Sequence, residues 1–334
     1  MRKFVIRLLV TAVLLGWLFT QVDVAGIGGV FAQTRPHWLA LAVVLNLVSF
    51  ALLIWRWLVL LIGVGVRQSF LQLTRVTLVS TFFSMFLPSS IGGDVVKMIL
   101  LAPDTNQREA AISSVVIDRV VGMAVTILVG ILAVLFLPVV WGDRAIIGTL
   151  AAATLIFGLG IVALFSRTLF RWVTHLAPGF LWRRFGEQIL KVHQSLLGFR
   201  RQPGILFAAS AISVLRQVLI CVSVFCAGRA FGITAGPLAY FATIPIALAI
   251  TVLPVAINGL GLQDQAMILL LATVGVAAAQ ALSLSIFLHV MRTFVGLTGG
   301  VWFAIGRRRS PVVQRPADAV GGTGCENDHL QLVR

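Results

Sequence analysis

The chain has 334 residues, of which 59% are hydrophobic and only 11% are charged. Soluble domains carry about 25% charged residues, so a chain this apolar could not cover its own surface with polar groups in water. The composition therefore excludes a soluble domain and predicts an all-α integral membrane protein. A bilayer core about 30 Å thick needs about 20 apolar residues per helix, which leaves room for roughly eight hydrophobic segments.

The net charge of +15 does not indicate a nucleic-acid-binding protein. Proteins that bind nucleic acid gather their basic residues on one solvated face, whereas here Lys and Arg flank the apolar runs. The positive-inside rule and the attraction of anionic lipid headgroups both predict this arrangement. We therefore expect membrane lipids, and anionic ones in particular, as the partners of this protein.

Six segments are long and apolar enough to span a bilayer. In chain order they are residues 4–20, 38–61, 111–137, 145–165, 205–229 and 281–305. The first follows Met1-Arg2-Lys3 and could be a secretory signal. It is long for the apolar region of a signal, and no clean A-x-A cleavage site follows it. An uncleaved first helix is therefore the preferred interpretation.

Two further apolar stretches, residues 73–102 and 238–275, are interrupted. Pro-Ser-Ser-Ile-Gly-Gly-Asp at residues 88–94 breaks the first, and Pro254 followed by Asn-Gly-Leu-Gly at residues 258–261 breaks the second. Neither half of either stretch is long enough by itself to span the bilayer without strain. The sequence therefore predicts six full transmembrane helices and two broken or re-entrant helical segments.

The distribution of Lys and Arg predicts the orientation in the membrane. Basic residues gather at the first helix, in residues 166–204 and at residues 307–309. We therefore expect a multi-pass protein of the cytoplasmic (inner) membrane with both termini in the cytoplasm. Residues 1–305 would form one transmembrane domain, and its halves, 1–165 and 205–305, would be joined by the basic interfacial stretch 166–204. Residues 306–334 would form a disordered tail.

The two broken segments resemble one another. Leu-Pro-Ser-Ser-Ile-Gly-Gly at residues 87–93 matches Leu-Pro-Val-Ala-Ile-Asn-Gly at residues 253–259, and Met98 aligns with Met267 after a short offset. The charge pattern predicts that the two copies face opposite sides of the membrane. Secondary transporters build their binding site from paired interrupted helices of an inverted repeat. We expect such a repeat here, the alternative being chance similarity between apolar segments.

The first break has the composition of an anion-binding cradle. A helix that restarts near Gly93 would direct its positive end at a lipid phosphate, and Lys97 would add a point charge one turn later. The alternative is an ordinary proline kink or a surface loop. Asn258, Gly259 and Asp264 lie at the corresponding part of the second break.

Charged residues inside spanning segments are costly, by about 2.5–3.5 kcal/mol each, and usually face a cavity or a partner. Asp118 could pair with Lys97 or Arg216, and Arg119 could reach a phosphate or Asp94. A purely structural ion pair between helices is the alternative. The candidate headgroup site comprises Pro88, Ser89, Ser90, Gly92, Gly93, Asp94, Lys97, Asp118, Arg119, Arg216, Asn258, Gly259, Gly261, Asp264 and Arg292.

The sequence offers little for catalysis. It has no nucleophile elbow, P-loop, dinucleotide-binding glycine pattern or aspartate-rich transferase motif, and no histidine–carboxylate cluster predicts a metal site. His289 is expected to be buried and hydrogen-bonded to a neighbour. We predict no catalytic residues, no metal and no cofactor.

Three motifs in order resemble the lysylphosphatidylglycerol synthase transmembrane-region family, which is often called flippase-like. They are Leu87-Pro88 through Asp94 and Lys97, Asp118-Arg119 with Gly122, and the run from Asn258 to Asp264. The resemblance covers residues 5–305. It implies an all-helical bacterial or archaeal membrane protein that moves, or helps to process, a phospholipid or a polyprenyl-linked lipid. We expect no soluble aminoacyl-transfer domain, which in the larger synthases follows the membrane part.

The chain departs from the family pattern at two places. Lys97 stands where the family has arginine, and the late G-x-R-E motif reads Gly261-Leu262-Gln263-Asp264. Lysine lacks the forked bidentate contact that arginine makes with phosphate. Three readings remain open: a lipid flippase, an accessory membrane subunit of a lipid-modifying enzyme, and a membrane-embedded glycosyl or aminoacyl transferase with Asp94 or Asp118 as base.

Overall fold

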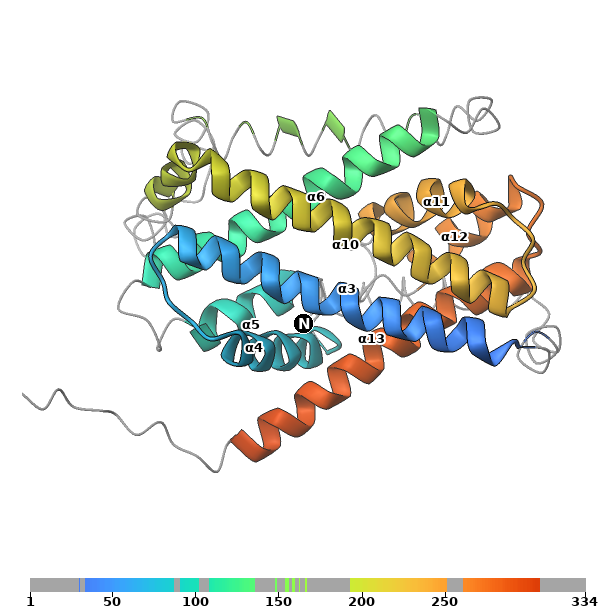
Figure 1. Ribbon diagram of the computed structural model, residues 1–334, viewed down its shortest axis with the longest axis horizontal. Helices are drawn as coiled ribbons and strands as arrows, with labels where there is room; N and C mark the ends of the chain where they lie inside the picture. Colours follow the sequence, from blue (N-terminus) through green and yellow to red (C-terminus); the bar gives the residue numbers. More distant parts are fainter. Residues whose placement is uncertain are drawn as a thin grey trace, which may run out of the picture.

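The computed structural model (Figure 1) describes residues 34–86, 91–101, 108–135, 193–250 and 261–306, together with positions 30, 148, 154–155, 158–159, 162 and 166. These residues fold into helices and turns. The helices are α3 (Pro36–Gly63), α4 (Phe70–Ser84), α5 (Ile91–Leu101), α6 (Arg108–Leu135), the short 3-10 helix η3 (Phe199–Arg201), α10 (Pro203–Ala230), α11 (Pro237–Ile250), α12 (Leu262–Ala272) and α13 (Ala278–Gly306).

Four of the helices are long and apolar enough to cross a membrane: Pro36–Gly63, Glu109–Ala133, Pro203–Ala230 and Ala278–Ile305. They confirm the all-α membrane fold and four of the six predicted spans. The predicted span 4–20, nearly all of the span 145–165, most of the interfacial stretch 166–204 and the tail from residue 307 lie outside the described residues.

Each interrupted stretch contains two separate helices, although residues 91–94 of the first predicted break belong to α5 and Pro254 and residues 258–260 of the second lie outside the described residues. α4 starts with a capping box, in which the Ser69 hydroxyl accepts a hydrogen bond from Gln72 N and the Gln72 side chain accepts one from Ser69 N. It ends at Ser84, and α5 starts at Ile91 and packs against α4. In the second half α11 ends at Ile250, and α12 starts at Leu262 and packs against α11.

The helices α10 to α13 repeat the helices α3 to α6. α3 and α10 have 28 residues each, and in each half a long helix is followed by two shorter helices and a second long helix. α3 and α10 each start with proline, and the turn after each contains a glycine at positive φ, Gly65 at 77° and Gly232 at 76°. A side chain is disfavoured at that φ, so glycine is the natural residue there.

α3 and α10 lie side by side and antiparallel through the middle of the molecule (Figure 1). At one end Arg35 N donates a hydrogen bond to the Ala230 carbonyl at 3.0 Å, and at the other end Gly63 packs against Ile205. α4 packs on α13 just as its counterpart α11 packs on α6. The two halves are therefore related by an approximate two-fold axis across the α3–α10 contact, which makes the repeat an inverted one.

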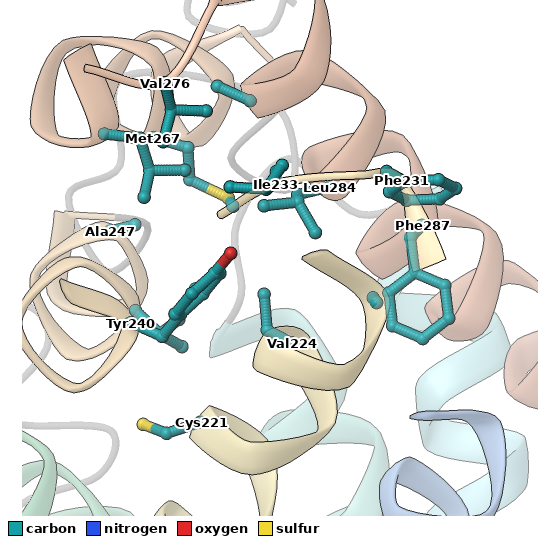
Figure 2. Close-up of a cluster of buried hydrophobic side chains, with 14 of the residues drawn as sticks. Cys221, Val224, Phe231, Ile233, Tyr240, Ala247, Met267, Val276, Leu284 and Phe287 are labelled. Carbon is teal, nitrogen blue, oxygen red and sulfur yellow. The ribbon is translucent and has the colours of Figure 1, made fainter. Parts of the chain in front are cut away.

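The α4–α13 and α6–α11 contacts between the halves use small residues. On α13 a Cβ at Gly299 would strike the backbone of Leu78 on α4, and on α6 a Cβ at Gly130 would lie 3.3 Å from Pro245 on α11. Close helix approach at small residues is usual in membranes. The second half also has its own apolar core, in which Tyr240, Val224, Met267, Leu284 and neighbouring side chains from α10 to α13 meet (Figure 2).

Candidate functional site

A cavity of about 380 Å³ lies between the two halves of the molecule. Residues of α3, α4, α5 and α6 line it together with residues of α10, α11 and α13. Its polar walls are formed by Asn46, Ser49, Arg56, Thr81, Ser84, Asp94, Lys97, Asp118, Arg119, Thr126, Arg216 and Arg292. Five of these side chains are basic and two are acidic, so the walls carry a formal excess of three positive charges.

The tightest ion pair in the cavity wall joins α3 to α6. Arg56 Nε lies 2.6 Å from Asp118 Oδ1, and Arg56 Nη1 donates a second hydrogen bond to Ser213 Oγ of α10 at 3.1 Å. Both members of the pair are buried. The Cβ of any side chain at Gly122 would lie 2.6 Å from Arg56 Nη1, so this glycine makes room for the guanidinium group.

This pair corrects the expected partner of Asp118, which was Lys97 or Arg216. Arg56 is absent from the predicted site because its partner lies 62 residues away on another helix. Its sequence did carry a signal, since it is a basic residue deep within the apolar segment 38–61. Such a residue usually faces a partner or a cavity.

The second ion pair in the wall joins α5 to α6 and uses Asp94, one of the two partners expected for Arg119. Arg119 Nη1 lies 3.6 Å from Asp94 Oδ2. The pair is looser than that of Arg56, and its side chains are 36% and 17% exposed. Asp94 lies in the first turn of α5, so the break in the first half does place a charged group at the cavity.

Three more cations reach the cavity from three helices. Lys97 of α5 is buried, with Nζ 5.1 Å from the centre of the Trp57 ring, within the range of a cation–π contact. Arg216 of α10 is also directed inward, and its Nε has no hydrogen-bond partner among the described residues. Arg292 of α13 donates from Nη2 to Gln263 Oε1 at 3.3 Å.

The predicted site residues therefore divide into four groups, of which the last, Gly261 and Asp264, is described below. Asp94, Lys97, Asp118, Arg119, Arg216 and Arg292 line one cavity. Pro88, Ser89, Ser90, Asn258 and Gly259 lie outside the described residues. Gly92 and Gly93 belong to the first turn of α5, where Gly93 packs against Ser84 of α4, and they are not among the lining residues.

Gly261 and Asp264 belong to a separate polar cluster between α12 and α13. The Asp264 carboxylate accepts hydrogen bonds from Gly261 N at 2.8 Å and from the Ser285 hydroxyl, and it lies 2.8 Å from His289 Nε2. His289 thus has the hydrogen-bonded neighbour that the sequence predicted, but it is half-buried and not buried as expected. Nowhere in the described part of the chain do three His, Cys, Asp or Glu side chains gather as they would around a metal ion.

The arrangement can attract an anion into a partly apolar space. Both lining carboxylates contact arginines, so the remaining charge is positive, and hydroxyl groups from α3, α4 and α6 stand beside it. Residues 4–300 match the family model described as "Lysylphosphatidylglycerol synthase TM region". Comparison with curated proteins and with solved structures gave no significant match.

Proposed function

Because the chain belongs to the lysylphosphatidylglycerol synthase transmembrane-region family, whose members are membrane proteins linked to lipid synthesis or translocation, we propose that it moves an anionic lipid across the membrane. The phosphate of a phospholipid or of a polyprenyl-linked lipid would enter the central cavity. The distribution of Lys and Arg supports a location in the cytoplasmic membrane with both termini in the cytoplasm.

The observation that carries this proposal is the positive charge of the cavity. Lys97, Arg216 and Arg292 come from α5, α10 and α13 to one space inside an apolar protein. Charge at that depth is costly unless it meets an opposite charge or water. A lipid phosphate supplies both the charge and the hydrogen-bond acceptors, and its acyl or prenyl chains can remain in the bilayer.

The repeat supports movement of the lipid as well as binding. The cavity lies between two inverted halves, and inverted repeats give transporters two related conformations that open to opposite sides. The transferase reading would use Asp94 or Asp118 as the base. Both carboxylates already contact an arginine, Asp118 with Arg56 and Asp94 with Arg119, so neither stands ready to take a proton from a substrate hydroxyl.

The proposal is tested with purified protein in vesicles that contain fluorescent phosphatidylglycerol, phosphatidylethanolamine or an undecaprenyl phosphate analogue. Quenching of the outer leaflet reports the movement of each lipid. We expect faster movement of at least one anionic lipid and none for phosphatidylethanolamine. Arg216→Gln should slow the movement about tenfold or more, because a charge-assisted contact is worth about 1.5–3 kcal/mol.

Arg67→Gln is the matched control, because Arg67 is exposed in the turn between α3 and α4, outside the cavity. It should move lipid at the wild-type rate. Equal rates with and without protein for every lipid would count against transport and favour the accessory role. Equal rates of lipid movement for the wild type and Arg216→Gln would show that the lipid does not pass through the cavity.

A further inference from the structure

The pair of buried Asp264 and half-buried His289 is the counterpart, in the second half, of Asp94 and Arg119. In each half the carboxylate lies in the first turn of the short helix, α5 or α12, and the cation lies on the long helix that follows, α6 or α13. In each half the cation comes 25 residues after the carboxylate. The two pairs therefore occupy equivalent positions in the inverted repeat.

The two pairs differ in geometry and in chemistry. Asp94 and Arg119 lie 3.6 Å apart in the cavity wall, whereas Asp264 and His289 lie 2.8 Å apart and the Asp264 side chain is only 4% exposed. Arginine keeps its charge at every physiological pH. Histidine is the side chain that gains or loses a proton near neutrality. The second half thus has a titratable cation where the first half has a permanent one.

Among the described residues, few other ionisable groups lie beside the Asp264–His289 pair. α12 packs mainly against α11 and α13, and Asp264 is the only ionisable residue of α12 itself. α13 contributes His289 and Arg292. α13 also packs against α4 and α10, whose ionisable residues are Arg75, Arg216, Cys221, Cys226 and Arg229. α11 contributes Tyr240, whose hydroxyl is directed at Gly228 of α10 and lies in the apolar core (Figure 2). Among the described helices, His289 is therefore the group whose charge can change beside Asp264.

The pair is also connected to the cavity. Gln263 precedes Asp264 in α12 and accepts the hydrogen bond from Arg292, which lies one turn after His289 on α13. Arg292 and Leu288, the residue before His289, both line the cavity. Separation of α12 from α13 would break the Asp264–His289 contact and move Arg292 in the same step.

We propose that Asp264 and His289 form a proton-binding site that couples lipid movement to the movement of protons. When His289 binds one proton, its positive charge holds Asp264 and keeps α12 against α13. When it releases that proton to water, the contact weakens and the second half opens. This inference rests on the proposed function and adds the source of energy for it.

The test imposes a pH difference of about one unit across vesicles that contain the protein and a fluorescent anionic lipid. With one proton per lipid, the wild type should enrich the lipid in one leaflet by up to about tenfold. Reversal of the gradient should reverse the enrichment, and a protonophore should abolish it. Leaflet composition is read by outer-leaflet quenching at steady state.

Two variants remove the proton site while preserving the contact with Asp264. His289→Gln keeps a hydrogen-bond donor without a titratable group, and His289→Arg recreates the pair of the first half. His289→Gln should still equilibrate the lipid between leaflets but show no enrichment under a gradient, whereas His289→Arg should hold α12 against α13 at every pH and slow the movement of lipid under either gradient. If His289→Arg does not fold, His289→Gln decides the question. His37→Gln, at an exposed histidine of α3, should respond to the gradient like the wild type.

The outcomes separate this inference from the proposed function. If the protein moves the lipid but the lipid stays equally divided between the two leaflets under either gradient, the proton site is wrong and the transport proposal stands. Full enrichment by His289→Gln would also overturn the proton site. A complete lack of lipid movement in the wild type would overturn both proposals.

Discussion

Arg56 of α3 and Asp118 of α6 form a 2.6 Å ion pair between buried side chains, and Ser213 of α10 binds the same guanidinium group. Three of the four long helices therefore meet at one arginine. Both residues line the cavity. The pair therefore fixes the positions of the helices around the site, and its two charges neutralise each other.

Removal of one member of this pair should destabilise the protein strongly. Asp118→Leu or Arg56→Leu leaves an uncompensated buried charge, which costs about 3–5 kcal/mol. The double variant Arg56→Leu/Asp118→Leu should recover most of that loss. Thermal unfolding of the three variants in one detergent measures the coupling. Additive losses in the double variant would show that the two side chains do not act as a pair.

Gly122→Ala should distort the site without removing any functional group. Its Cβ would lie 2.6 Å from Arg56 Nη1, so the guanidinium group must move away from Asp118 or Ser213. We expect a loss of about 1–3 kcal/mol, which is usual for overpacking, and slower lipid movement. Gly204→Ala is the control, because a Cβ there meets nothing within 4 Å. Equal thermal stability of both variants would contradict this account.

Substitutions of Lys97 test whether the cavity binds an anion. Lys97→Gln removes a buried charge from the cavity and should weaken the binding of short-chain phosphatidylglycerol about tenfold or more, since hydrogen bonds to charged groups are worth about 1.5–3 kcal/mol. Lys97→Arg should bind at least as tightly as the wild type, because arginine adds a forked contact with phosphate. Calorimetric titration measures both. Stronger binding by Lys97→Gln than by the wild type would contradict an anion site.

Gly299→Ala should separate α13 from α4. The new Cβ would strike the backbone of Leu78, which cannot move aside as a side chain can. Gly130→Ala at the equivalent α6–α11 contact meets only Pro245 Cβ at 3.3 Å and should cost less. Thermal unfolding of the two variants checks this order, and the reverse order would be inconsistent with the packing described above.

The sequence predicted the features that depend on local pattern. Apolar runs identified the four described spans, the proline and glycine clusters located both breaks, and the likeness of residues 87–93 and 253–259 revealed the repeat. Asp94 was also one of the two partners that the sequence suggested for Arg119, the other being a phosphate.

The features that depend on tertiary packing could not be predicted. Arg56 contacts Asp118 only because α3 packs on α6, and no spacing in the sequence encodes that neighbour. The sequence placed Asp264 in the candidate headgroup site because it lies at the second break. Its side chain instead contacts Ser285 and His289, since the rotation of α12 about its axis directs the carboxylate at α13.

The antiparallel contact of α3 and α10 has a mechanical consequence. A contact that lies on the two-fold axis is the same in both orientations of the halves, so it can serve as the pivot of a rocking motion. In a rocking motion about that pivot, the α4–α13 and α6–α11 contacts, which lie away from the axis, would open and close. Distance probes at Ala42 and Ser223, which touch across the pivot, should stay at one separation, while probes across Leu78 and Gly299 should record two.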